Sequence, residues 1–222
     1  LANGTGTWLD NTGILSGTTW TDTANTYILN GKTVNLNVGS SVTCTILVAA
    51  IQADSAGGTM AVGNSGAVTL GQAGNLCAVS SAYAGTMMTW GTGTCSLTLN
   101  GSVAYSSTST AGMFTVAANQ TLTVQNTGGA GTKSIKETST GYAVVFSGGT
   151  LTVSNSGGTA LSSEANGRTV DATGGTGTIT GAVTVSAGHA WVNRGGGANV
   201  NITGDVTASG IGVPIVQAGS GK

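Results

Sequence analysis

A nine-residue phrase occurs twice in this chain, and it constrains the fold more than any other feature. Residues 121–129 read TLTVQNTGG, and residues 150–158, which begin 29 residues later, read TLTVSNSGG. Related phrases recur at intervals of 23 to 34 residues, and their central apolar residues are Val34, Val68, Leu97, Leu122, Leu151, Ile179 and Ile202. Repetition at intervals of this size is typical of solenoids and other repeat architectures.

Polar and apolar residues alternate within each phrase, and this period of two predicts a β-strand with one buried face. No segment has the 3.6-residue apolar stripe and caps of an amphipathic helix, so we expect few helices. Each interval then forms one coil of two or three short strands, and a coil is stable only against its neighbours. The sequence therefore predicts an all-β fold, a right-handed parallel β-helix (solenoid) of about six or seven coils.

Equivalent residues of successive phrases should stack on one another in such a solenoid. We expect Leu122, Leu151 and Ile179 to form an aliphatic ladder inside it. Asn126 and Asn155 should stack at a turn, because Asn tolerates left-handed backbone angles. The threonines of the phrases should form an outward ladder, with Thr121 and Thr123 followed by Thr150 and Thr152, and then by Thr178 and Thr180.

An antiparallel β-sandwich is the alternative fold. Residues 27–36 (YILNGKTVNL) and 96–105 (SLTLNGSVAY) each place Asn-Gly between alternating runs, which is the strongest short signal for a hairpin. A sandwich does not explain the repeated phrase, so we prefer the solenoid. We divide the chain into an N-terminal capping segment, residues 1–30, and the solenoid, residues 31–222, which we expect to continue beyond its last residue or to meet another subunit there.

Charged residues make up only 6% of the chain, against roughly 25% in an average soluble domain. With a net charge of −1, there is no basic patch for phosphate contacts, so we expect no nucleic-acid partner. The longest apolar run, ILVAAI at residues 46–51, is too short to span a membrane. A surface rich in Thr, Ser, Asn and Gly but poor in charge suits an extracellular, cell-surface or virion protein.

Stretches that together cover most of the chain resemble repetitive β-helical surface proteins. The opening GTGTWLDNTGILSGTTWTDTANTYILNGKTVNLN resembles the capping segment of such proteins. SGGTLTVSNSGGTA, residues 147–160, resembles passenger domains of autotransporter adhesins. GTITGAVTVSAG and NVNITGDVTASG resemble repeats of β-helical proteins on phage virions, as in fibres and tailspikes, and on bacterial surfaces. The resemblance implies a β-helical fold and an exposed location.

The three cysteines match no zinc-site or CxxC spacing, and we expect neither a metal nor a cofactor. Cys44 and Cys77 follow their phrase anchors by ten and nine residues. This spacing predicts that the two are neighbours, as stacked buried thiols or as a disulfide.

Several polar and aromatic residues of the C-terminal half fall at similar distances from their phrase anchors. We interpret them as a candidate glycan-contact edge formed by Glu137, Glu164, Arg168, His189, Trp191 and Arg194. Its alternative is a solvated edge with charge pairs worth under ~1 kcal/mol and with Trp191 packed on the solenoid flank. No set of residues supplies converging acid, base and stabilising groups, so we expect no enzyme; a glycan hydrolase or lyase is the catalytic alternative.

These observations favour a non-enzymatic structural or adhesive solenoid of an extracellular fibre, virion or cell-surface appendage. We expect self-association, as a homotrimer or an end-to-end filament, because exposed edge strands pair readily. Surface glycans are a further expected partner. A polysaccharide-binding or polysaccharide-cleaving β-helix is one alternative function. An ice-binding solenoid is the other, because Thr-x-Thr on a flat solenoid face is the arrangement that several ice-binding proteins use.

Overall fold

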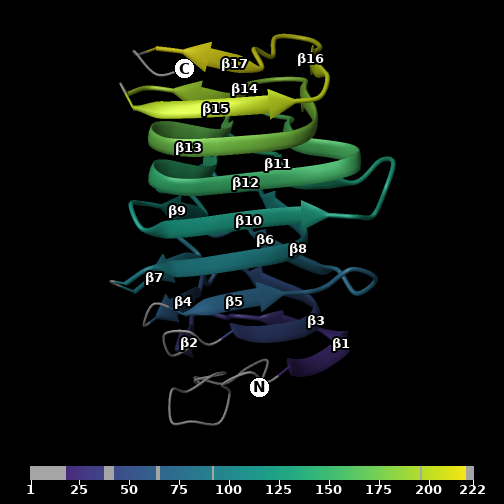
Figure 1. Cartoon of the computed structure of the whole chain (residues 1–222), viewed down its shortest axis with the longest axis vertical. Helices are drawn as coiled ribbons and strands as arrows, with labels where there is room; N and C mark the ends of the chain where they lie inside the picture. Colours follow the sequence, from purple (N-terminus) through teal and green to yellow (C-terminus); the bar gives the residue numbers. More distant parts are fainter. Residues whose placement is uncertain (1–18, 38–42, 64–65, 92, 196, 219–222) are drawn as a thin grey trace.

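The computed structural model describes residues 19–37, 43–63, 66–91, 93–195 and 197–218, and these residues contain strands and turns but no helix. Seventeen strands form one continuous hydrogen-bonded sheet. The sheet winds into a β-solenoid of about seven turns, as Figure 1 shows. The all-β solenoid and its number of coils were therefore predicted correctly from the repeated phrase.

The strands stack into three faces, which we name A, B and C in the order in which the chain meets them within a coil. Face A contains β2 (Thr33–Asn37), β4 (Thr59–Gly63), β7 (Met88–Trp90), β9 (Phe114–Val116), β14 (His189–Asn193) and β17 (Ile215–Gln217). Face B contains β5 (Ala67–Leu70), β10 (Gln120–Asn126) and β15 (Ala198–Thr203). Face C contains β6 (Cys77–Ser81), β11 (Lys133–Glu137) and β16 (Val206–Ala208).

Five longer strands bend around the corners of the coil. β1 (Thr19–Ile28), β3 (Thr43–Ala53) and β8 (Cys95–Tyr105) run from face B onto face C. β12 (Tyr142–Ser163) and β13 (Arg168–Val185) cover faces A, B and C in turn. β12 and β13 pair with each other on all three faces, with register shifts near the corners.

All strand pairs are parallel, which excludes the antiparallel sandwich for the described residues. The only antiparallel pairings among them are isolated bridges in turns, Asp54 with Gly57 and Gln72 with Asn75. The two Asn-Gly dipeptides form corners instead of hairpins. Asn30 and Gly31 both have positive φ and turn the chain from β1 to β2. The other dipeptide lies inside β8, where the strand bends onto face C.

Apolar side chains fill the interior in ladders that follow the register. On face B, Val68 pairs with Leu97, Leu97 with Leu122 and Leu122 with Leu151, as the phrase predicted. Each of these residues is at most 1% exposed. Burial of a side chain of this size stabilises by roughly 1.5–3 kcal/mol, so stacking the coils supplies the stability that a single coil lacks.

Two of the predicted phrase anchors are in the wrong register. Val34 lies in β2 on face A and pairs with Met60, so it is not a copy of the face B phrase. Leu151 pairs with Gly177, and Ile179 pairs with Val153 instead. The predicted stack of Leu122, Leu151 and Ile179 is therefore wrong by two residues at its last member.

Asn126 and Asn155 are register partners, as predicted, but for a different reason. Neither has a positive φ. Both side chains are buried and bridge the corner between faces B and C. Asn126 donates to the Lys133 carbonyl oxygen, and the Asn155 amide donates to the carbonyl oxygens of Thr132 and Thr159. The side-chain amides thus add hydrogen bonds to backbone carbonyl groups where the strand bends.

Cys44 and Cys77 are both buried, but they are not register partners and no disulfide joins them. Cys44 lies in β3 and pairs with Val68 on face B, whereas Cys77 begins β6 and pairs with Gly101 on face C. The predicted stacked or bridged pair is wrong, because Val34, the anchor counted for Cys44, lies on face A, whereas Val68, the anchor counted for Cys77, lies on face B.

The proposed capping segment is partly described. β1 lies within residues 1–30 and pairs in parallel with β3, so it is hydrogen-bonded to the solenoid. Residues 1–18 lie outside the described residues. A search of the described residues for membrane-crossing helices found none of sufficient length and hydropathy.

Candidate functional surfaces

Face B presents a regular array of hydroxyl-bearing side chains. Its central ladder consists of threonines on six successive strands, Thr45, Thr69, Thr98, Thr123, Thr152 and Thr178, with Asn201 on the next strand. The register along this part of the face has no irregularity. The strands that carry the array lie at the front in Figure 1.

Two further ladders flank the central one, because outward positions recur every second residue along a strand. One contains Ala67, Ser96, Thr121, Thr150, Thr176 and Asn199. The other contains Asn100, Gln125, Ser154, Thr180 and Thr203. Burial alternates along β8 and β10: the neighbours of these residues are buried, so the residues of the array face the surface.

The predicted threonine ladder is thus partly right. Thr121 pairs with Thr150, and Thr123 pairs with Thr152, as expected. The next partners are Thr176 and Thr178, whereas the sequence predicted Thr178 and Thr180. The predicted ladder covered only three coils and so omitted Thr45, Thr69 and Thr98, which extend it toward the N-terminal end.

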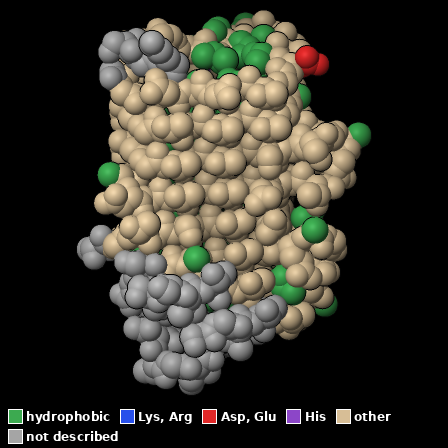
Figure 2. Space-filling model, viewed as in Figure 1, with side chains coloured by type: hydrophobic (Ala, Val, Ile, Leu, Met, Phe, Trp, Pro, Cys, Tyr) green, Lys and Arg blue, Asp and Glu red, His purple; other side chains and the backbone are tan. Residues whose placement is uncertain are grey.

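Face B carries no charged side chain on the outward positions named above. The space-filling view of this side shows a broad surface without lysine or arginine, with an acidic group only at its upper margin (Figure 2). Exposed hydrophobic side chains gather at the upper end of the view, above this surface. The result is a wide surface that can donate and accept hydrogen bonds but has little electrostatic field.

Two members of the predicted glycan-contact edge are buried and cannot contact a ligand from the surface. Glu137 and Trp191 are both 0% exposed. The Trp191 ring packs inside the solenoid edge-to-face with Phe146, with the ring centroids 6.0 Å apart, and its Nε1 donates to Asn193. Trp191 therefore belongs to the core.

Glu137 lies inside the corner between faces C and A. The Ser139 backbone N–H and the Ser163 hydroxyl, at 3.2 Å, donate to its carboxyl oxygens. Gly167 leaves room for this carboxyl, since a Cβ placed there would lie 2.5 Å from the Glu137 carboxyl carbon. Burial raises the pKa of Glu137 to about 7, although these hydrogen bonds act in the opposite direction. The side chain is a buried acid, not a contact residue.

Arg168 and Arg194 do come together, around two residues that the sequence prediction missed. Both guanidinium groups donate to the Tyr142 hydroxyl, at 2.5 and 2.9 Å, and both pair with Asp171. The Arg168 guanidinium carbon also lies 4.7 Å from the centre of the Tyr142 ring. We call these four residues the arginine–tyrosine cluster; it carries one more positive than negative charge.

The distance between successive coils could have predicted that Tyr142 lies beside Arg168. This residue lies 26 positions before Arg168, and the two are register partners on face A. Arg168 pairs in turn with His189. The Nδ1 of His189 lies 3.0 Å from the Val213 carbonyl oxygen, so a hydrogen bond there requires a proton on Nδ1. His189 is half-buried beside the cluster and contacts the next coil.

Glu164 lies on the other side of the corner, with two lysines of β11. It forms an ion pair with Lys133 and a longer one with Lys136, at 3.9 Å. Partial burial alone would raise the pKa of Glu164, but the hydrogen bond and charge of Lys133, with the charge of Lys136, hold it below its ordinary value. Both Lys133 and Glu164 are about one-third exposed.

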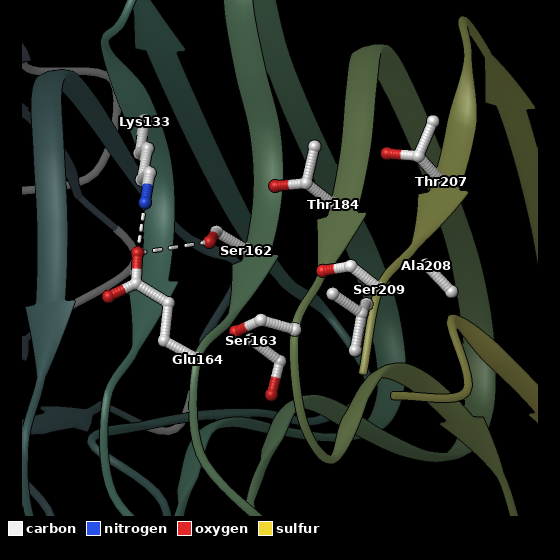
Figure 3. A pocket seen from close by; sticks show the side chains of 10 residues that line it. Lys133, Ser162, Ser163, Glu164, Thr184, Thr207, Ala208 and Ser209 are labelled. Atoms are coloured by element: carbon white, nitrogen blue, oxygen red, sulfur yellow. Dashed lines mark hydrogen bonds and ion pairs between the residues drawn. The ribbon is translucent and has the colours of Figure 1, made fainter. Parts of the chain in front are cut away.

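A shallow groove on face C adjoins this ion pair (Figure 3). Its volume is about 280 Å³, and hydroxyl groups of Ser162, Thr184 and Thr207 lie along it on successive strands. Two neighbouring hollows on the same face, of about 280 and 460 Å³, are also lined by Lys133. Face C is thus uneven and carries charge, in contrast to face B.

Comparison with known proteins yields no match: no protein-family model, no curated protein and no solved structure is similar to this chain. The functional argument therefore depends on the surfaces of the solenoid.

Proposed function

We propose that this protein is a non-enzymatic structural or adhesive solenoid of an extracellular fibre, virion or cell-surface appendage. One observation carries the proposal: parallel hydrogen bonding connects the 17 strands of the described residues, β1 to β17, into one sheet. Each inner coil is held by the coils on both sides, and this stacking makes the fold stiff. The scarcity of charge and the hydroxyl-rich outer faces suit a surface that contacts other surfaces through many weak interactions.

Self-association is part of this proposal. Apolar side chains are exposed in the last described coil, where Val206, Ile211, Val213 and Ile215 are 44%, 75%, 46% and 41% exposed. Inner residues at equivalent positions are covered; Trp191, the register partner of Ile215, is 0% exposed. Apolar surface of this kind favours contact with another layer, and we propose a second copy, in a homotrimer or an end-to-end filament.

The test is the absolute mass in solution by light scattering, with negative-stain images of the same fraction. We expect trimers or rods in the wild type and a shift toward monomer in a Val213→Lys, Ile215→Lys variant. Thr207→Lys, which adds a charge on face C of the same coil, is the matched control. A wild-type protein that is monomeric at all concentrations would contradict the assembly.

A second candidate function is the binding of an acidic surface glycan at the arginine–tyrosine cluster. Arg194 is 45% exposed, and the two guanidinium groups share a single carboxylate, so donors remain for a sulfate or carboxylate of a sugar. The Tyr142 ring offers an apolar surface beside them. We include no cleavage step, because Glu137, the acid proposed beside Glu164, has no exposed surface.

Titration calorimetry with sulfated and uncharged oligosaccharides of equal length tests this candidate. The sulfated ligand should bind more tightly, and Arg194→Gln should weaken it about tenfold, whereas Lys32→Gln, a change of the same charge on a distant coil, should not. Equal affinity of the two variants would reject the cluster as the binding site.

A further inference from the structure

We propose that face B binds ice, through its array of threonine hydroxyl and methyl groups. The inference rests on face B alone and does not depend on the structural or adhesive function proposed above. Its basis is the central ladder of six threonines in unbroken register, with flanking ladders that are mostly Thr, Ser and Asn.

The spacing of the array is set by the sheet. Neighbouring strands lie about 4.8 Å apart, and outward residues of one strand recur about every 6.6 Å. Face B therefore holds its hydroxyl groups on a two-dimensional lattice, and these two repeats are similar in size to repeats between water oxygens in ice. A partner of irregular shape can contact only part of such a regular array, whereas a crystalline surface can match the array over many coils.

Threonine suits this task because its side chain is stiff. The two heavy atoms on Cβ restrict χ1, so each hydroxyl and methyl group keeps its orientation when water is ordered around it. A single hydroxyl–water bond contributes little net free energy, since bulk water offers the same bond. Binding to ice therefore requires many groups in phase, and the unbroken register of face B provides that.

The lack of charge on face B supports the same conclusion. A charged side chain orients nearby water strongly around itself, and this shell competes with the ice lattice. Face C makes the contrast within the same molecule. Its equivalent central ladder is chemically mixed and contains a lysine, in the order Gln52, Ser80, Ala104, Lys136, Ser162, Thr184 and Thr207. The regular array is therefore a property of face B and not of every face.

Inhibition of ice recrystallisation and thermal hysteresis of the purified protein test the proposal. The key variant is Thr123→Lys, which places a long charged side chain in the centre of the array. Thr89→Lys is the matched control, because Thr89 is an exposed outward residue of β7 on face A. We expect Thr123→Lys to need at least tenfold more protein for the same inhibition, and Thr89→Lys to behave like the wild type.

Circular dichroism and thermal unfolding of each variant verify that the solenoid is folded at the assay temperature. Should Thr123→Lys unfold, Thr123→Val and Thr152→Val replace it, since both keep the branched shape and lose only the hydroxyl group. Absence of thermal hysteresis and of recrystallisation inhibition in the folded wild type would overturn the proposal. Equal loss in Thr123→Lys and Thr89→Lys would also overturn it.

A parallel measurement separates ice from another ordered hydroxylated solid. Wild type and Thr123→Lys are sedimented with microcrystalline cellulose and with chitin. One outcome is that the wild type binds one of these solids, that Thr123→Lys does not, and that neither protein is active on ice. That result would reject ice as the ligand and assign face B to a crystalline polysaccharide. Activity on ice without such binding supports the proposal.

Discussion

Trp191 occupies the interior space that a side chain at position 177 would need. A Cβ placed at Gly177 would lie 2.6 Å from Cη2 of the Trp191 ring, closer than van der Waals contact permits. Trp191 lies on face A and Gly177 on face B, so one large residue is accommodated by a missing side chain on the opposite wall. This relationship explains why Leu151 has no apolar residue as its next register partner.

Gly177→Ala should therefore destabilise the solenoid by about 1–3 kcal/mol through overpacking. Trp191→Leu should also destabilise it, because it leaves a cavity. In the double variant the added methyl group occupies part of that cavity. The double variant should therefore lose less stability than the sum of the losses in the two single variants. Urea unfolding of the four proteins in a double-mutant cycle measures the coupling. Strict additivity would show that the two residues do not compete for the same space.

Glu137 should make stability fall as pH rises. Its pKa is raised from 4.5 to about 7 in the folded protein because of burial. The folded state therefore holds a proton that the unfolded state has lost between these two values. The stabilisation from this group is complete below about pH 4.5 and is lost as pH rises through about 7, by up to about 3 kcal/mol.

Glu137→Gln removes the titration and should flatten this part of the pH profile. Urea unfolding of both proteins from about pH 4 to pH 8 provides the test, and the difference between their profiles isolates Glu137 from other acids. Glu164→Gln is the matched control; its pKa is lowered, so the wild-type carboxylate should stabilise at higher pH. Parallel profiles for wild type and Glu137→Gln would contradict the buried acid.

Asn155→Ala should cost about 1–3 kcal/mol, because it removes the hydrogen bonds of a buried side chain. The Asn155 amide donates to the carbonyl oxygens of Thr132 and Thr159 and to the Thr132 hydroxyl. Asn166→Ala is the control, because Asn166 is exposed in the turn that precedes β13. Thermal unfolding should show a marked fall in midpoint for the first variant and almost none for the second. Similar midpoints would mean that water replaces the amide.

Gly101→Ala should be among the most destabilising single changes in the chain. A Cβ there would lie 1.7 Å from the Cys77 carbonyl oxygen, which is backbone and cannot rotate away. Gly129→Ala is a suitable control, since Gly129 also has a positive φ but no atom within 4 Å of its Cβ position. Gly101→Ala should give little soluble, folded protein. Gly129→Ala should fold, with a free energy of unfolding lower by only about 1 kcal/mol. Equal effects would mean that backbone conformation, not close contact, requires glycine.

The candidate surfaces were harder to predict than the fold. Arg168 and Arg194 were selected from the sequence, yet Tyr142 and Asp171, to which both bind, were missed. Trp191 was placed in the candidate glycan-contact edge, with packing on the solenoid flank as the alternative, but its ring packs inside the solenoid against Phe146. Whether a residue points in or out depends on its parity within a strand, and strand ends are the least certain feature of a sequence pattern.

By itself, the sequence determined the period, the class of fold and the stacking of the clearest phrases. Alternation within a phrase and recurrence between phrases are local properties, and Leu122 on Leu151 or Thr123 on Thr152 follows from them directly. Only the tertiary structure decided the register at β13, the interior position of Glu137 and the length of the face B ladder. Those features depend on how much space the other walls of the coil fill, as Trp191 and Gly177 show, and that volume is shared by residues far apart in the chain.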